Sequence, residues 1–202
     1  MDVSIERLVN ALPHGGSPGE SVDWDVVGQT WGGSFPEDFR AFMEVYGRGT
    51  IDNVLAIATP LDGSPTPGVL RCRDLTPTRP TECRVGGNVV TYPAWPAPGG
   101  LVGWGTTGGG LDLYWRTEGT DPGLWPVVVR NHRGGAATEH RMGVAEFLVR
   151  MLGDRPQRPA DIPDILGSPH SRFIQADEER RLMSTGVDPW EYLDEFDDDD
   201  EE

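Results

Sequence analysis

The sequence predicts an α+β domain, with a mostly antiparallel β-sheet packed with N-terminal helices and closed by one C-terminal helix. Three observations support this fold class. Apolar residues recur at helical spacing in the first 46 residues and again near residue 150, whereas the runs between them have strand character. Glycine (27) and proline (18) together make up about 22% of the chain against a usual value of roughly 12%, so we expect short elements joined by many turns.

Three helices are predicted before residue 50. The first covers residues 3–12 and ends at Pro13, and the second follows Asp23, whose side chain is suited to an N-cap. The third begins after Pro36, carries two acids in its first turn and ends at glycines. Its apolar face consists of Phe35, Phe39, Phe42, Met43 and Tyr46.

Strand patterns occupy the middle of the chain. One strand is predicted over residues 51–59 and another over 89–92, although prolines obscure most of 69–100. In residues 111–115 apolar and polar side chains alternate, and residues 125–129 form an apolar run rich in valine. Glycines and a Thr-Asp-Pro-Gly turn bound these two strands, which predicts an aromatic hairpin at the centre of the sheet.

Aromatic side chains divide this hairpin into core and rim. Three of the seven tryptophans, Trp104, Trp115 and Trp125, lie within it. We assign Trp115 and Trp125 to the core together with Phe39 and Phe42, and we place Trp104 at the rim.

The predicted domain organisation has three parts. Residues 1–153 form the globular domain and end in a helix over 142–152. Residues 154–187 contain a proline-rich linker and a short charged helix. Residues 188–202 hold ten acids and no base, which predicts an acidic disordered tail.

Charge limits the classes of partner. The net charge is −16, and −6 remains when the tail is left out. An acidic chain without a basic stripe is unsuited to binding nucleic acid, whereas a basic protein partner is electrostatically complementary. No apolar run reaches the roughly 18–20 residues of a membrane span, and no cationic signal segment is present. With Cys72 and Cys83 expected as unlinked thiols, we expect a cytoplasmic protein that does not contact membranes.

Two patterns imitate chemical motifs. Residues 103–108, GWGTTG, match the letters of a dinucleotide loop, but a strand follows instead of the required helix, so we interpret them as a turn between strands. His132 and His140 flank a Gly-Gly turn and would meet in a hairpin, which leaves a hydrolase as the enzyme-class alternative. Without metal spacing or a nucleophile motif, we predict a non-enzyme with no catalytic residue, cofactor or metal site.

Several segments resemble the SUKH superfamily, which includes fungal cell-wall-synthesis regulators and bacterial immunity proteins. The matching segments are Trp24, FPEDFRAF at 35–42, YGRGTI at 46–51, WGTT at 104–107, LYW at 113–115 and DPGLWPVVV at 121–129. The resemblance covers roughly residues 1–153. It departs from the family at Phe35, where leucine is usual, and at the TTGGGLD turn, where the family often has Asn-Gly-Asp.

The resemblance implies an α+β binding module without a catalytic set. Our leading hypothesis is an immunity protein that covers the active surface of a cognate basic toxin, often a nuclease. The alternative is a regulatory scaffold whose acidic tail docks a second protein, and a purely solubilising tail is also open. Candidate partner-binding residues are Trp104, Asp112, Glu118, Asp121, Trp190 and Phe196. The oligomeric state is left open.

Overall fold

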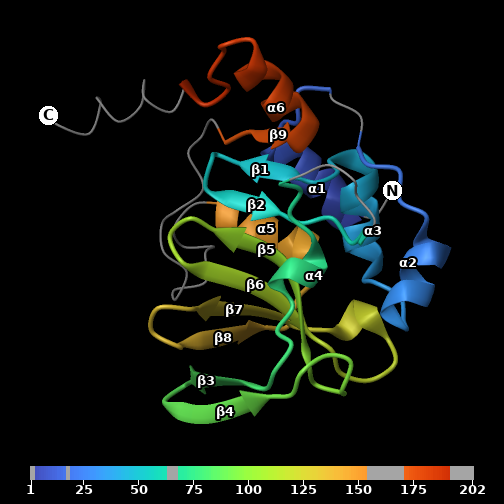
Figure 1. Ribbon diagram of the computed structural model, residues 1–202, viewed down its shortest axis with the longest axis vertical. Helices are drawn as coiled ribbons and strands as arrows, with labels where there is room; N and C mark the ends of the chain where they lie inside the picture. The colour runs from blue at the N-terminus through green and yellow to red at the C-terminus, as the bar shows by residue number, and fades with distance from the viewer. Residues whose placement is uncertain (1–2, 17–18, 63–67, 154–170, 192–202) are drawn as a thin grey trace, which may run out of the picture.

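The computed structural model describes residues 3–16, 19–62, 68–153 and 171–191. It contains a seven-stranded antiparallel sheet, a separate two-stranded hairpin and helices on both sides of the sheet (Figure 1). This arrangement confirms the predicted α+β class. Within the described parts of the chain, none of the helices combines the length and apolar character that crossing a bilayer requires.

The helices are α1 (Val3–Ala11), α2 (Trp24–Trp31), α3 (Glu37–Val45), α4 (Cys72–Leu75), α5 (Val144–Leu152) and α6 (Ala176–Ser184), with a 3-10 turn η1 (Pro122–Leu124). The strands are β1 (Gly49–Ile51), β2 (Leu55–Ile57), β3 (Thr81–Val85), β4 (Asn88–Tyr92), β5 (Leu101–Thr107), β6 (Leu111–Arg116), β7 (Val127–Asn131), β8 (Ala137–His140) and β9 (Phe173–Gln175). The order in the large sheet is β8-β7-β6-β5-β2-β1-β9.

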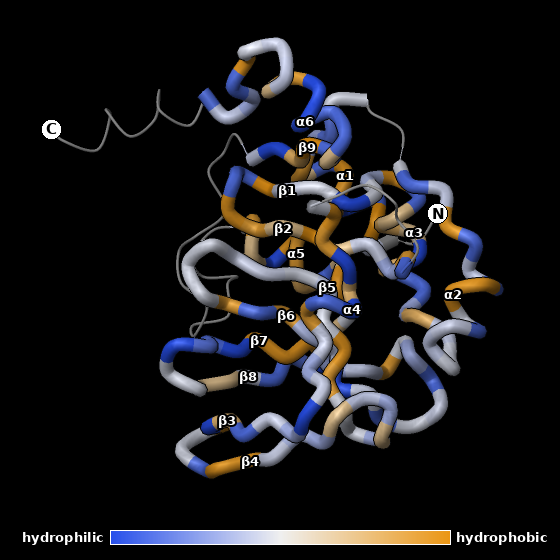
Figure 2. Tube along the Cα trace, viewed as in Figure 1, coloured by the Kyte–Doolittle hydropathy of each residue, from blue (hydrophilic) through white to orange (hydrophobic). Residues whose placement is uncertain are grey.

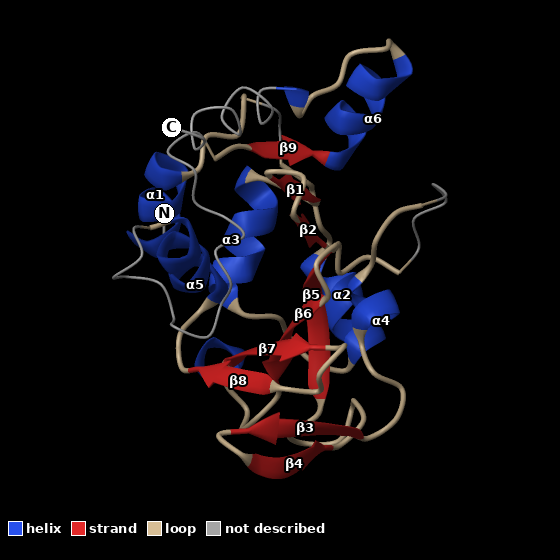
Figure 3. Ribbon diagram, turned by 90° about the vertical axis from the view of Figure 1, so that its left-hand side faces the viewer, coloured by secondary structure: helices blue, strands red, loops and turns tan. Residues whose placement is uncertain are grey.

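The main core lies between one face of the sheet and the helices α1, α3 and α5, which Figure 3 shows together on one side. Trp115 on β6 packs edge-to-face against Phe39 of α3 at 4.8 Å, and Trp104 on β5 packs against Phe147 of α5 at 6.1 Å. In Figure 2 the apolar colour is clearest on β2 and α5. The predicted core positions Phe39, Phe42 and Trp115 are confirmed as buried, and Trp125 packs partly buried against the same cluster.

Helix α3 links the N-terminal segment to α5. Its N-terminus follows Pro36, and its buried face contains Phe39, Phe42 and Met43, as the sequence predicts. Asp38, in its first turn, reaches across to α5 and accepts a hydrogen bond from the backbone N–H of Ala145 at 3.0 Å. A side chain of α3 therefore caps the positive end of α5.

Two predicted elements differ from the structure. Residues 51–59 are not one strand, because Asp52 and Asn53 adopt left-handed conformations (φ 50° and 54°) and turn the chain into the β1–β2 hairpin. Short polar side chains tolerate this conformation better than others do, so the turn is chemically reasonable.

The second difference concerns residues 171–187, which were predicted to lie outside the globular domain. Phe173–Gln175 form β9, which pairs with β1 at the edge of the large sheet, and the Phe173 side chain is buried in the main core. The charged helix does follow, as α6, with Gln175 as its N-cap. The globular unit therefore includes described residues beyond the predicted boundary at 153.

The glycine-rich segment takes the predicted form. Gly103 and Gly105 lie within β5, and the turn at 108–110 leads into β6, so a strand and not a helix follows the glycines. A Cβ on Gly103 would lie 2.3 Å from the Cβ of Leu75, which shows how closely α4 approaches β5. Both cysteines are free and buried, which confirms the prediction of unlinked thiols.

Candidate interaction face

The second face of the sheet is the one opposite α1, α3 and α5. One row of directly paired residues crosses it from edge to edge, namely Ile174, Thr50, Ala56, Thr106, Asp112, Arg130 and Ala137. All of them except Ala137 are partly exposed. The β3–β4 hairpin packs against this face over β6 and β7, where Cys83 and Tyr92 form a small cluster with Tyr114 and Val128.

Asp112 is the centre of a hydrogen-bonded group on this face. Its carboxylate accepts hydrogen bonds from the Thr106 hydroxyl at 3.0 Å and from the Tyr114 hydroxyl at 3.2 Å. The Arg130 guanidinium lies 3.7 Å away and the His132 Nδ1 atom 3.4 Å away. Burial, and secondarily the charge of Asp112, raises the pKa of Tyr114, so its hydroxyl remains a neutral donor.

Arg116 is the centre of a second group, next to the first. Its guanidinium contacts Glu118 at 2.6 Å and Glu139 at 3.1 Å. Glu139 also accepts a hydrogen bond from the Tyr92 hydroxyl at 2.8 Å, and Glu118 lies 3.4 Å from Arg141. The side chains of this group therefore hold one another in place.

We call the two groups together the polar face. It consists of Thr106, Asp112, Tyr114, Arg116, Glu118, Arg130, Glu139 and Arg141. Its charged members are three acids and three arginines, and each is at least partly exposed. The arrangement offers carboxylates and guanidinium groups in fixed positions at the surface, which suits recognition of a polar partner.

The prediction that Trp104 lies at the rim is wrong. Its side chain is fully buried between Trp115 and Phe147. The reason is the pleat of β5, which directs Val102 and Trp104 to the helix-covered face while Gly103 faces α4.

The predicted acids have different surroundings. Asp112 and Glu118 both belong to the polar face. Asp121 is exposed and accepts a hydrogen bond from the backbone N–H of Gly123 at 2.9 Å, so it caps η1. The structure therefore brings Asp112 and Glu118 into one surface and gives Asp121 a local structural contact.

The prediction that Trp190 belongs to a free tail is also wrong. Its side chain is buried, and its indole N–H donates a hydrogen bond to Glu179 of α6 at 2.8 Å. Phe196 lies outside the described residues. The acidic segment therefore starts from a fixed point beside α6.

The two histidines of the enzyme-class alternative do not come together. His132 lies at the β7–β8 turn, whereas His140 lies at the far end of β8, opposite Val127. His140 contacts the Thr138 hydroxyl and the Phe147 ring. Among the described residues, no group of three or more His, Cys, Asp and Glu side chains is arranged to hold a metal ion.

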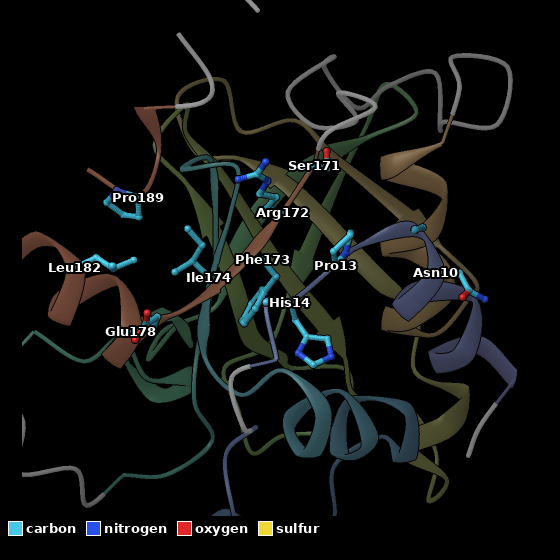
Figure 4. A pocket seen from close by; sticks show the side chains of 12 residues that line it. Asn10, Pro13, His14, Ser171, Arg172, Phe173, Ile174, Glu178, Leu182 and Pro189 are labelled. Carbon is cyan, nitrogen blue, oxygen red and sulfur yellow. The ribbon is translucent and has the colours of Figure 1, made fainter. Parts of the chain in front are cut away.

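A hollow of 670 Å³ lies at the β9 edge. Figure 4 shows Asn10, Pro13 and His14 on one side of it and Glu178, Leu182 and Pro189 on the other, with β9 between them. A smaller hollow of 350 Å³ lies on the other side of α6, beside Thr50 and Ala56. Neither hollow brings predicted site residues together.

The sequence predictions named only Asp112 and Glu118 of the polar face and missed its three arginines, Thr106, Tyr114 and Glu139. A signal was present, because Asp112, Tyr114 and Arg116 alternate with Leu113 and Trp115 along one strand. Alternation of this kind assigns the polar set to a common face. Which residues of β7 and β8 lie beside them depends on the register and is not readable from one strand.

Comparison with known proteins returned no match, whether with protein-family models, with curated proteins or with solved structures. The SUKH resemblance rests on its motifs.

Proposed function

We propose that this chain is a non-catalytic protein-binding module of the SUKH type that neutralises a cognate basic toxin domain. The observation that carries the proposal is the polar face, whose ionic and hydroxyl groups are held in place by contacts with one another. A surface whose side chains are already ordered loses little conformational entropy on binding. Arginine and tyrosine are also enriched at protein interfaces.

Charge supports a basic partner. The chain has a net charge of −16, of which ten negative charges lie in residues 188–202. Negative potential accelerates encounter with a basic toxin domain and makes the association rate sensitive to salt. Trp190 supports this role because it holds the start of the acidic segment against α6.

A charge-reversal pair tests the contact surface. We expect Glu118→Arg to weaken binding of the cognate basic toxin domain by about tenfold or more, because a like charge then faces the partner. Glu44→Arg is the matched control, since it makes the same change of charge at an exposed position in the last turn of α3, a helix that covers the other face of the sheet. Calorimetric binding and growth of cells that express the toxin are the two readouts.

An equal loss of affinity in both variants would assign the effect to net charge and would contradict the proposal that the polar face contacts the toxin. Absence of both binding and growth protection in the unaltered chain would contradict the immunity function itself.

The alternative, a regulatory scaffold, is favoured by the fixed origin of the acidic segment. Deleting residues 192–202 distinguishes toxin neutralisation from the scaffold function. The deletion leaves the hydrogen bond from Trp190 to Glu179 in place. Toxin neutralisation should survive this deletion, with a slower association rate at low salt. A scaffold instead loses its interaction with the second protein.

A further inference from the structure

The β3–β4 hairpin ends the molecule on the side opposite α6, with β4 as the outermost strand (Figures 1 and 3). Its two strands pair from Thr81↔Tyr92 to Val85↔Asn88 around a Gly-Gly turn. The inner strand β3 is joined to the β7–β8 turn, because the Arg84 N–H donates to the Gly135 carbonyl at 2.8 Å. The outer edge of the hairpin is therefore the edge of β4.

The direction of the Arg84 N–H determines which groups of β4 point outward. In an antiparallel ladder, two opposite residues direct their backbone groups either toward each other or both away. Arg84 lies opposite Val89 and directs its N–H away from β4, so the N–H and C=O of Val89 point away from β3. Thr91, two residues along, has the same orientation.

These outward groups are not used elsewhere in the described residues. No backbone hydrogen bond of Val89 or Thr91 beyond the hairpin is found there. Both residues are exposed, and Val89 is the more notable because 68% of this apolar residue is accessible. By contrast, the β9 edge of the large sheet is only three residues long, and its Phe173 N–H donates to the Pro13 carbonyl.

The strand also lacks the features that normally prevent edge pairing. Asn88–Tyr92 contains no charge and no proline, and four of its five residues are β-branched or aromatic. Figure 2 shows the apolar colour on this outer strand. Such an edge is a template for another strand.

We propose that two copies of this chain associate through β4, in antiparallel pairing about a twofold axis at Val90. With Val90 facing Val90 of the second copy, Val89 lies opposite Thr91 of that copy. The outward N–H and C=O groups of both residues then form four hydrogen bonds across the axis. A strand that satisfies all its outward groups with its own copy is self-complementary, as a twofold interface requires.

Charge and side-chain chemistry favour a second copy as the occupant. β4 itself is uncharged, and the outward neighbours on β3 are one acid, Glu82, and one base, Arg84, so no excess of like charge meets at the axis. The acidic segment starts beside α6, at the other end of the molecule (Figure 1). Val89 and Thr91 are β-branched and are favourable cross-strand neighbours.

Sedimentation equilibrium of the full chain tests the proposal. The unaltered chain should show a monomer–dimer equilibrium, with modest affinity because the interface is small. Val89→Lys should raise the dissociation constant by about tenfold or more, because edge lysines oppose pairing. Val26→Lys is the control, since Val26 is also an exposed valine (52%) but lies on α2. A monomer at every concentration, or equal effects of the two lysines, would overturn the proposal.

Cross-linking tests the register. In the double variant Val89→Cys/Thr91→Cys, the thiol at position 89 of one copy lies opposite the thiol at position 91 of the second copy. Oxidation should then give a covalent dimer on a non-reducing gel. Val89→Cys alone places the two thiols two residues out of register and should give far less. The two native cysteines are buried, so they do not compete. Equal cross-linking of the single and double variants would refute this register.

Discussion

Replacing Arg48 by methionine is expected to reduce the free energy of unfolding by about 3 kcal/mol. The Arg48 side chain is only 11% exposed, and its guanidinium contacts Glu20 at 2.9 Å and Asp177 of α6 at 2.8 Å. Glu20 is 12% exposed, and one of its carboxylate oxygens has no hydrogen-bond partner. Without the arginine, a buried carboxylate is left without a counter-charge.

The magnitude follows from the unequal exposure of the two acids. Removing one partner of a buried ion pair costs roughly 3–5 kcal/mol. The lower end applies because Glu20 keeps the hydrogen bond from the Thr59 hydroxyl at 3.2 Å. Asp177 is 54% exposed and regains water, so its pair with Arg48 contributes less than about 1 kcal/mol.

Urea unfolding followed by tryptophan fluorescence measures this loss in Arg48→Met, Glu20→Gln and the double variant. The double variant should lose less than the sum of the two single losses, because it leaves no uncompensated charge in that pair. Arg150→Met is the control. It removes an exposed pair with Glu146 within α5 and should cost less than about 0.5 kcal/mol. A loss in Arg48→Met no larger than the control's, or strict additivity in the double variant, would refute the reasoning.

Three further outcomes are expected. Gly49→Ala places a Cβ 2.3 Å from the Ile174 carbonyl oxygen, so β9 must shift, and hydrogen exchange over 171–191 should accelerate; unchanged exchange would contradict this packing. Asp38→Ala removes the acceptor for the Ala145 N–H and should cost about 1 kcal/mol in urea unfolding, whereas undiminished stability would remove its role as a cap. Burial opposes ionisation of Asp177, but its arginine partners lower its pKa below the ordinary 3.8. Its stabilising contribution is therefore present above that value and lost as pH falls through the lowered pKa, so the stabilities of Asp177→Asn and the unaltered chain should converge in acid.

The elements that the sequence predicts well are those long enough to show a period. In α3, Phe39, Phe42 and Met43 recur at helical spacing within a helix of nine residues, and the flanking proline and glycine mark both ends. The six residues of β6 show the alternation of a strand. β1, β2 and β9 have three residues each, too few for a period to be visible. The division of 51–59 by a turn and the strand at 173–175 were missed for this reason.

The polar face was predicted less completely, because the burial and ion pairs of its acids depend on neighbouring strands that the sequence does not identify. Asp112 and Glu118 were chosen as acids near aromatic residues, and both belong to the polar face. Their arginine partners come from β6, from β7 and from the segment after β8. An acid in a strand is equally compatible with a solvated surface and with a paired cluster.

The sequence by itself determined the α+β class, the three N-terminal helices and the strand that follows the glycine-rich turn, since these depend on local periodicity and on turn chemistry. Only the tertiary structure decided which side chains are buried. Trp104 is in the core because the pleat of β5 directs it toward α5, and Trp190 is buried because α6 lies beside it. Burial is a property of packed surfaces, and packing brings together residues far apart in the chain, as Asp38 and Ala145 illustrate.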